Sequence, residues 1–215
     1  MKNLSHTVSR LEELFDEVNA HLFDGYLIKP VITVSPDKKR SSGSRYLGWI
    51  TTYKAWKNTS NDVADDGYYE INICAEHLDR PFADTIGTLI HEMAHLYNLQ
   101  EGIKDCSRWG NAYHNKYFAK AAQKYGLKVK YNKSYGFNET ELNKDTARWV
   151  AEKFSGESFN LYRGGSKKST KTGKSIEYQQ QSSRKYVCPC KTIIRATKPV
   201  YVICGYCDGE FICEL

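Results

Sequence analysis

Two histidines one helical turn apart, with a glutamate between them, are the residues of this chain best suited to chemistry. His91 and His95 are four positions apart, and Glu92 follows the first of them. On a helix such histidines lie on one face, so both imidazoles can bind one Zn²⁺ ion at about 2.0–2.1 Å. Glu92 then lies near the metal without binding it, and its carboxylate can accept a proton from water that the metal has made acidic. The spacing predicts a catalytic zinc site in which Glu92 is the general base.

A catalytic zinc ion needs a third protein ligand, and the residues just after the motif restrict the choice. The short-spaced pattern HExxHxxGxxH is excluded, because Asn98 stands at its glycine and Glu101 at its last histidine. Glu101 is also too close to His95 to reach back from the end of the same helix. Asp105 and Cys106, in the connection that follows, remain possible ligands.

His114 is the preferred third ligand. The sequence predicts a helix over about 110–125, with His114 one turn before Phe118 on its apolar face, so that His114 points inward. Gly102 and Gly110 bracket the connection and allow the chain to reverse. Three nearby side chains could stabilise an oxyanion, and the sequence does not choose among them: Tyr97, Arg108 and Tyr113.

The C-terminal segment carries a second set of metal ligands. Cys204 and Cys207 form a CxxC pair, Cys188 and Cys190 form a CxC pair, and the inner cysteines lie 14 positions apart. Four thiolates in two such pairs are typical of a structural zinc site with Zn–S distances near 2.3 Å. The segments TIIRAT and VYVI between the pairs are typical of two hairpin strands. The first pair is one residue shorter than a CxxC, so the alternatives are that Cys213 replaces one ligand or that the cysteines are free thiols.

Net charge also singles out the C-terminal segment. The chain has 31 Lys and Arg against 25 Asp and Glu, and its last 56 residues carry ten of the basic and four of the acidic ones, which is the whole excess of six. Basic side chains beside aromatic ones can hold a nucleic-acid strand without reading its sequence. A solvated lysine-rich linker is the alternative. The predicted nucleic-acid contacts are Lys191, Arg195 and Lys198, with the tyrosines at 186, 201 and 206.

Helices and strands that position these residues follow from hydrophobic periodicity. Helices are predicted over 4–22, 79–102, 110–125 and 139–154, and strands over 31–34, 45–52 and 68–74. Asp79 is the expected N-cap of the motif helix, and Gly48 marks a possible bulge in the second strand. This order predicts an α+β domain over 1–154, a basic flexible linker over 155–183 and a small β module over 184–215.

Composition indicates a protein of a reducing compartment with no membrane-spanning segment. No apolar run approaches the roughly 20 residues needed to cross a bilayer, and the first residues, MKNLSHTVSRLEELF, lack the apolar core of a secretory signal. The expected location is the cytoplasm, with no membrane partner. There the seven cysteines would be metal ligands or reduced thiols before they would be disulfides.

Several longer segments together resemble one protein family. They are LEELFDEVNAHLFDGYL, YYEINICAEHL, LIHEMAHLYN and GNAYHNKYF. Between residues 4 and about 126 the chain is similar to the SprT-like zinc metallopeptidases, especially the short members from bacteria and phages, with a weaker similarity to their zinc-ribbon-like C-terminal module. In this module the family usually has CxxC in both pairs, from which the CxC here departs.

The resemblance implies a fold, a site and a substrate. The fold would be a minimal zincin, a small twisted sheet packed on helices. The protein would act in a bacterial or phage-infected cell. The zinc ligands would be His91, His95 and His114, and Glu92 the catalytic base. A peptide would lie along an edge strand, expected at YYEINI. Relatives such as the Spartan proteases cleave proteins bound or crosslinked to DNA.

The predicted function is therefore a zinc-dependent endopeptidase that acts on protein or peptide substrates, among them DNA-associated proteins. It would use one catalytic zinc ion and a second, structural one. The alternative is a nucleic-acid-binding zinc-ribbon protein whose zincin core is inactive or a scaffold. A zinc hydrolase for a non-peptide bond is a third possibility that the metal chemistry permits.

Overall fold

The computed structural model of this chain describes residues 3–37, 46–58, 67–107, 112–164 and 184–214. The chain has a mixed α+β fold and divides into two compact units, Met1–Ser166 and Lys167–Leu215. The division falls within the segment predicted as a linker, most of which lies outside the described residues. Within the described residues, no helix is long and apolar enough to cross a membrane.

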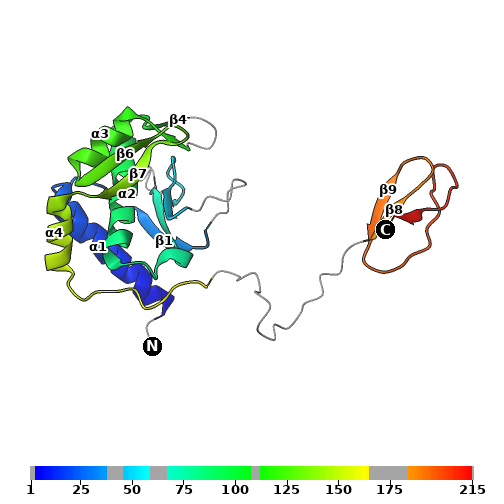
Figure 1. Ribbon diagram of the computed structural model, residues 1–215, viewed down its shortest axis with the longest axis horizontal. Coiled ribbons are helices and arrows are strands. Elements are labelled where there is room, and N and C mark those ends of the chain that lie inside the picture. The colour runs from blue at the N-terminus through cyan, green and yellow to red at the C-terminus, as the bar shows by residue number, and fades with distance from the viewer. Residues whose placement is uncertain (1–2, 38–45, 59–66, 108–111, 165–183, 215) are drawn as a thin grey trace. The chain divides into compact units, whose positions relative to one another are not determined.

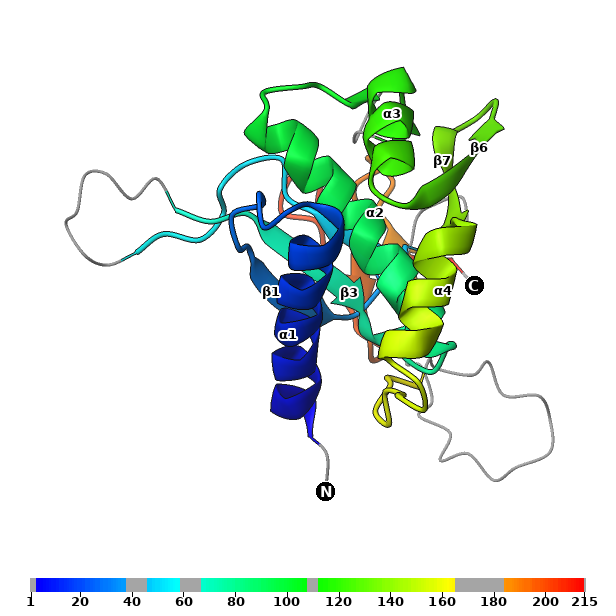
Figure 2. The same ribbon diagram turned by 90° about the vertical axis from the view of Figure 1, so that its left-hand side faces the viewer.

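A three-stranded sheet and two long helices form the centre of the first unit. The sheet order is β1–β3–β2, with β1 (Val31–Ser35) parallel and β2 (Gly48–Ile50) antiparallel to β3 (Glu70–Cys74). Helices α1 (Leu4–Leu22) and α2 (Phe82–Gln100) contact each other, α1 packs on β1, and α2 packs on β2 and β3. Figure 2 shows both helices in front of the sheet.

Helix α1 confirms the prediction over 4–22, because four of its apolar side chains recur on one face and are 0 % exposed, namely Leu11, Leu14, Phe15 and Val18. The Asn3 side chain caps its first turn by accepting a hydrogen bond from the His6 N–H at 3.1 Å. Helix α2 begins later than expected. Its N-cap position is Pro81, which makes no side-chain cap, and Asp79 lies before the helix.

Strand β3 differs from its prediction in two ways. It is the central strand, so YYEINI is not an edge strand, and an edge of this sheet is formed by β2 instead. Its burial does not alternate either: from Ile71 to Cys74 every residue is buried, and Asn72 is 0 % exposed. Ile71 and Ile73 belong to the hydrophobic core, whereas the Asn72 side chain is covered by hydrogen bonds with the side chains of Thr33 and Cys74.

The second half of the first unit is a four-stranded sheet with two short helices. The order is β4–β5–β7–β6, from β4 (Cys106–Ser107) and β5 (Tyr113–His114) to β7 (Gly136–Leu142) and β6 (Leu127–Asn132). Strands β6 and β7 form an antiparallel hairpin that the sequence did not reveal. Figure 1 shows this hairpin beside α3 (Lys116–Lys124) and near the upper end of α2.

Two helix predictions were wrong at their starts. The helix expected over 110–125 is α3, which begins only at Lys116, because the Asn115 side chain accepts a hydrogen bond from the Tyr117 N–H at 2.7 Å. The helix expected over 139–154 is α4 (Lys144–Lys153). Residues 139–142, expected to begin this helix, are instead the end of β7. Asn143 caps α4 by accepting a hydrogen bond from the Thr146 N–H at 2.9 Å.

The second unit contains a three-stranded antiparallel sheet with the order β10–β8–β9. Its strands are β8 (Arg184–Val187), β9 (Ile193–Ala196) and β10 (Ile212–Glu214). The predicted hairpin is partly wrong: TIIRAT contains β9, but its partner is β8, and VYVI contributes only an isolated bridge from Ile203 to Glu210. The small core consists of Tyr186, Cys188, Cys204 and Phe211.

Candidate metal centre

Three imidazoles converge in the first unit at a spacing that fits one metal ion. Nε2 of His91 lies 3.2 Å from Nε2 of His114, and the ligand atoms of His91, His95 and His114 all lie within 4.8 Å of one another. Ligand atoms around a tetrahedral zinc ion with Zn–N bonds of 2.0–2.1 Å are about 3.3–3.4 Å apart. The donor set therefore suits zinc in both its chemistry and its spacing.

Helix α2 and strand β5 bring these histidines together over one aromatic side chain. His91 and His95 lie one turn apart on α2, whereas His114 lies in β5 and not on a helix, which corrects its predicted position. The ring of Phe118 lies 4.6, 4.3 and 4.7 Å from the rings of His91, His95 and His114, measured between centroids. His114 thus lies against Phe118, although it does so from β5 and not from the helix that the two were expected to share.

Two of the histidines are oriented by partners on their other ring nitrogen. Nδ1 of His95 lies 2.7 Å from Oδ2 of Asp105, and this oxygen also accepts a hydrogen bond from Nδ2 of Asn98 at 2.9 Å. Nδ1 of His91 lies 2.9 Å from the hydroxyl of Thr140. Such partners fix the orientation and tautomer of an imidazole, so that its Nε2 can bind a metal.

Asp105, an alternative ligand by sequence, is bound to a histidine instead. Burial alone raises the pKa of its carboxyl, but the hydrogen bonds from His95 and Asn98 outweigh burial and hold this pKa below its ordinary value. Cys106, the other alternative, lies opposite His114 in the β4–β5 pair. Its thiol, Asp105 and His95 form a second group whose ligand atoms lie within 4.8 Å of one another.

The charge state of His91 also suits metal binding. Burial, together with the neighbouring His95 and His114, holds the pKa of His91 well below its ordinary value. His91 is therefore neutral at neutral pH, and the neutral imidazole is the form that binds metals.

Glu92 is buried beside the three histidines, at a point where the backbone of β2 comes close. Only 6 % of Glu92 is exposed, and burial raises the pKa of its carboxyl to about 7. A Cβ atom added to Gly48 would lie 3.3 Å from Oε1 of Glu92 and 2.9 Å from the carbonyl oxygen of Asn72. Gly48, expected as a bulge, is instead a site of close approach between β2, β3 and α2.

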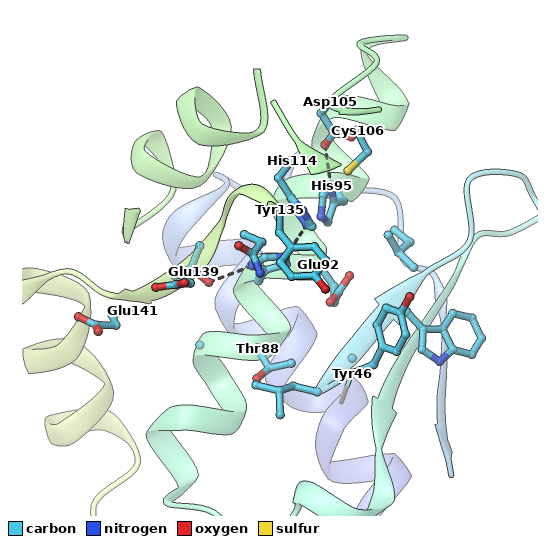
Figure 3. A pocket seen from close by; sticks show the side chains of 18 of the residues that line it. Tyr46, Thr88, Glu92, His95, Asp105, Cys106, His114, Tyr135, Glu139 and Glu141 are labelled. Atoms are coloured by element: carbon cyan, nitrogen blue, oxygen red, sulfur yellow. Dashed lines mark hydrogen bonds and ion pairs between the residues drawn. The ribbon is translucent and has the colours of Figure 1, made fainter. Parts of the chain in front are cut away.

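An open cleft of about 1060 Å³ lies over these residues. Residues 46–53, which include β2, line one part of it, residues 138–142 of β7 line another, and α2 contributes the three metal-motif residues. Figure 3 shows Glu92, His95, His114 and Tyr135 gathered in this cleft, with Tyr46 farther along it. An extended polymer can therefore reach the candidate metal site from solvent.

Tyr135 is a site residue that sequence reasoning missed. The oxyanion candidates taken from the sequence do not all reach the cleft: Tyr97 packs on Tyr125 at 4.9 Å, and the Tyr113 hydroxyl lies 3.4 Å from that of Tyr131. Arg108 lies outside the described residues. The sequence offers one local signal for Tyr135, the glycine that follows it. This signal is weak, because a tyrosine before a glycine in a polar turn is also common on ordinary surfaces.

Four cysteines converge in the second unit. The Sγ atom of Cys188 lies 3.2 Å from that of Cys207 and 3.4 Å from that of Cys190, and the Sγ atoms of Cys190 and Cys204 are 3.7 Å apart. Thiolates around a tetrahedral zinc ion with Zn–S bonds of 2.3 Å are about 3.8 Å apart. Cys213 does not belong to this group, and all seven cysteines are free thiols in the structure.

The short CxC turn has an unusual backbone conformation and an unusually acidic thiol. Lys191 has a φ of 68°, a left-handed conformation, and its N–H donates to the carbonyl of Cys188 at 2.7 Å. Hydrogen bonds from the hydroxyl and the N–H of Thr192 lower the pKa of Cys190 to about 6. The lowered pKa favours the thiolate of Cys190, the form that binds metals.

The predicted nucleic-acid residues are only partly at the surface. Lys191, Arg195 and Lys198 are exposed, as are Tyr201 and Tyr206 at 73 and 89 %. Tyr186 is a core residue of the second unit, and its hydroxyl accepts a hydrogen bond from the Val200 N–H at 3.1 Å. It cannot stack on a base.

Comparison of the chain with protein-family models, with curated proteins and with solved structures gives no match. The geometry and chemistry of the residues themselves therefore carry the functional assignment.

Proposed function

We propose that this chain is a zinc-dependent endopeptidase with a zincin-type catalytic domain. One observation carries the proposal: the ligand atoms of three imidazoles converge beside the buried carboxylate of Glu92, in a cleft open to solvent. Three protein ligands, a base and an accessible fourth position are the parts that hydrolytic zinc sites need. His91, His95 and His114 would hold the metal, which fits their spacing.

The proposed reaction is the hydrolysis of a peptide bond. Zinc bound here would act as a Lewis acid on the carbonyl oxygen and make the attacking water more acidic. Glu92 accepts one proton from that water, whose oxygen forms a bond to the carbonyl carbon while the carbonyl π electrons move onto oxygen. When these electrons return, the C–N bond breaks and the amine nitrogen takes the proton from Glu92. The products are a carboxylic acid and an amine.

The carboxylate of Glu92 suits both halves of this transfer. A general base works best when its pKa is close to the working pH, because it must first accept and then release the proton. Burial raises the pKa of Glu92 to about 7 before any metal is bound. The positive charge of the metal would lower this value, so the burial offsets part of that effect.

Strand β2 offers a place for an extended peptide. It is at the edge of its sheet, pairs only with β3 among the described residues, and lines the cleft together with the segment that follows it. A peptide that adds as a further strand along β2 would pass the metal site. Gly48 keeps β2 close to Glu92, so the scissile bond of such a peptide would lie near the base.

We further propose that the second unit is a zinc-ribbon-like module with one structural zinc ion held by Cys188, Cys190, Cys204 and Cys207. Its buried core has only four residues, too few to stabilise a domain of this size without a further constraint. Zinc would provide that constraint, because metal binding and folding are coupled in such modules.

A second candidate function is nucleic-acid binding by this module. It is favoured by two strongly exposed tyrosines, Tyr201 and Tyr206, on a unit that also exposes Lys191, Arg195 and Lys198. Stacking on aromatic rings combined with phosphate contacts binds single strands without sequence preference. The two functions can coexist, with the module recruiting the peptidase to proteins on DNA.

The test compares the wild-type chain with Glu92→Gln, using denatured casein as substrate and measuring zinc content in parallel. Wild type should cleave casein, whereas Glu92→Gln should keep its zinc and lose cleavage; casein that stays intact with zinc-loaded wild type, or is still cut by Glu92→Gln, rejects the peptidase. Intact casein together with hydrolysis of a simple ester would favour the non-peptide alternative. Zinc should amount to about two equivalents in wild type and about one in both His114→Ala and Cys204→Ser.

Binding of a fluorescent single-stranded oligonucleotide separates the second candidate. Binding should persist in Glu92→Gln, weaken as salt concentration rises, and disappear when residues 160–215 are deleted. Binding that survives this deletion excludes the module as the nucleic-acid site.

A further inference from the structure

We propose that the hydroxyl of Tyr135 stabilises the negative charge that develops on the substrate carbonyl oxygen during hydrolysis. This inference rests on the proposed peptidase function and deepens it by assigning the hydrogen-bond donor that completes the site. Neither the metal motif nor the spacing of the histidines indicates this residue.

The backbone of Tyr135 is tied directly to a metal-ligand candidate. The N–H of His114 donates a hydrogen bond to the carbonyl oxygen of Tyr135 at 3.0 Å. On the other side, the N–H of Tyr135 donates to Oδ1 of Asn132 at 3.3 Å. Tyr135 therefore keeps a fixed position relative to His114.

The residue after Tyr135 makes this connection unusually close. Gly136 pairs with His114 in the parallel β5–β7 register and has a φ of 70°. A Cβ atom at this position would lie only 2.0 Å from the carbonyl oxygen of His114, so a side chain cannot be accommodated here without moving one strand. The turn that ends at Gly136 thus holds Tyr135 against the strand that carries the third histidine.

The Tyr135 side chain enters the catalytic cleft. It lines the same cavity as His91, Glu92, His95 and His114. In Figure 3 its ring is drawn with His114, His95 and Glu92, whereas Tyr46 is drawn apart from them. A phenol in this position can point its O–H towards a carbonyl group that Glu92 and the histidines have positioned.

Three other donors near the histidines are occupied by contacts within the protein. The Thr140 hydroxyl lies against Nδ1 of His91 at 2.9 Å. Arg80 donates to the carbonyl of His77 at 2.9 Å and to the hydroxyl of Thr88 at 3.1 Å, and that hydroxyl donates to the carbonyl of Asp84 at 3.0 Å. These hydrogen bonds hold the three donors against the protein.

The chemistry requires such a donor. When water adds to a peptide carbonyl, its oxygen gains nearly a full negative charge, and a positioned donor stabilises that charge more than it stabilises the neutral carbonyl. Removing one such donor typically lowers kcat by about 10²–10³-fold. A phenol keeps its proton at neutral pH under ordinary conditions and is therefore a donor there.

The test uses Tyr135→Phe in the full zinc-loaded chain, with Tyr131→Phe as matched control. Tyr131 is 60 % exposed, and its hydroxyl lies near that of Tyr113, outside the cleft lining. Both variants should keep the zinc content of wild type. Tyr135→Phe should lower kcat for a fluorogenic peptide by about 10²-fold with little change in KM, and Tyr131→Phe should behave as wild type.

A binding measurement that needs no turnover accompanies the kinetics. A phosphinic peptide, whose tetrahedral anion resembles the transition state, should bind Tyr135→Phe at least tenfold more weakly than wild type. The parent peptide should bind equally to Glu92→Gln and to the Glu92→Gln, Tyr135→Phe double variant.

The outcomes separate the two proposals. A wild-type chain that neither cleaves peptides nor binds the phosphinic peptide refutes the peptidase function itself. If wild type is active, the role of Tyr135 is refuted by an unchanged kcat in Tyr135→Phe, by equal weakening of parent and phosphinic peptides, or by loss of zinc.

Discussion

Oδ2 of Asp105 lies 2.7 Å from Nδ1 of His95, and both side chains are more than nine-tenths buried. The carboxylate also accepts a hydrogen bond from Asn98, the residue that stands where the short-spaced zinc motif has its glycine. Asn98 thus belongs to the support of the metal centre. Asn98 in place of the motif glycine therefore has a structural role, because it hydrogen-bonds to the carboxylate that orients His95.

Asp105→Asn should weaken zinc binding by about 10–100-fold, because an amide holds the imidazole less firmly and makes it a poorer electron donor. The measurement is a competition titration of the catalytic site against a chromophoric chelator. Asp84→Asn is the control, since Asp84 also lines the cleft but lies beside Thr88 and not beside a histidine. Equal zinc affinity in Asp105→Asn and wild type would contradict the supporting role of Asp105.

Gly136→Ala should damage the proposed zinc site, although residue 136 would bind no metal. The new Cβ would lie 2.0 Å from the carbonyl oxygen of His114, so β5 must move and His114 with it. Gly156→Ala is a matched control, because Gly156 also has a positive φ, 77°, but nothing lies within 4 Å of its Cβ position.

Both substitutions should destabilise the first unit by the cost of a left-handed alanine, about 1–2 kcal/mol. Only Gly136→Ala should lose more stability than this and bind less zinc. Thermal unfolding and zinc content of the three proteins measure the difference. Similar zinc content in both variants would show that the close approach at Gly136 does not position His114.

The ionisation of Glu92 should make the metal-free protein less stable as pH rises. Its folded pKa, about 7, is above the ordinary value of 4.5, so the protonated folded form is favoured below pH 4.5 and this advantage is lost as pH rises through 7. Glu92→Gln should therefore match wild type near pH 4.5 and exceed its stability at pH 8, by at most about 3 kcal/mol.

Glu76→Gln is the control with the opposite sign. Burial alone raises the pKa of Glu76, but hydrogen bonds from the Asp37 N–H and from Arg163 outweigh burial and lower it. Stability that depends on Glu76 is present above its unfolded pKa and is lost as pH falls through the folded value. In chelator-treated protein, Glu76→Gln should be destabilising at pH 8, where Glu92→Gln is stabilising. A pH-independent difference between Glu92→Gln and wild type would contradict the buried ionisation.

How much of this structure can be read from the sequence depends on how local each feature is. Helix α1 and the pair His91 and His95 follow from a repeat of 3.6 residues within one element, and both were predicted. The start of α4 was predicted too early, at 139, because the apolar residues near 142–154 fit one continuous helix. The segment 136–142 is a strand that pairs with β6 on one side and with β5 on the other.

The third histidine shows the same limit within the site. The sequence placed His114 and Phe118 on one face of a shared helix, and the two rings do lie side by side, although His114 is in β5. The strand of His114 was not predicted, because it also depends on Tyr135 and Gly136, which lie more than 20 residues away in the chain and pair with His114 as Cys106 of β4 does. Tyr135 enters the cleft through this same contact, so no periodic pattern around Tyr135 could have indicated it.

The C-terminal CxC turn leads to a prediction about strain. Lys191 adopts a φ of 68°, which costs an ordinary residue about 1–2 kcal/mol and costs glycine little. Lys191→Gly should therefore stabilise the proposed zinc-bound turn by about 1 kcal/mol and slow the transfer of zinc from the cysteine site to a chelator by about fivefold. Lys198→Gly removes an equal charge from an exposed position without a positive φ, and it should not slow the transfer. If both variants release zinc at the same rate, charge and not backbone strain sets the stability of this turn. Faster release from Lys191→Gly alone would show that the lysine side chain supports the site.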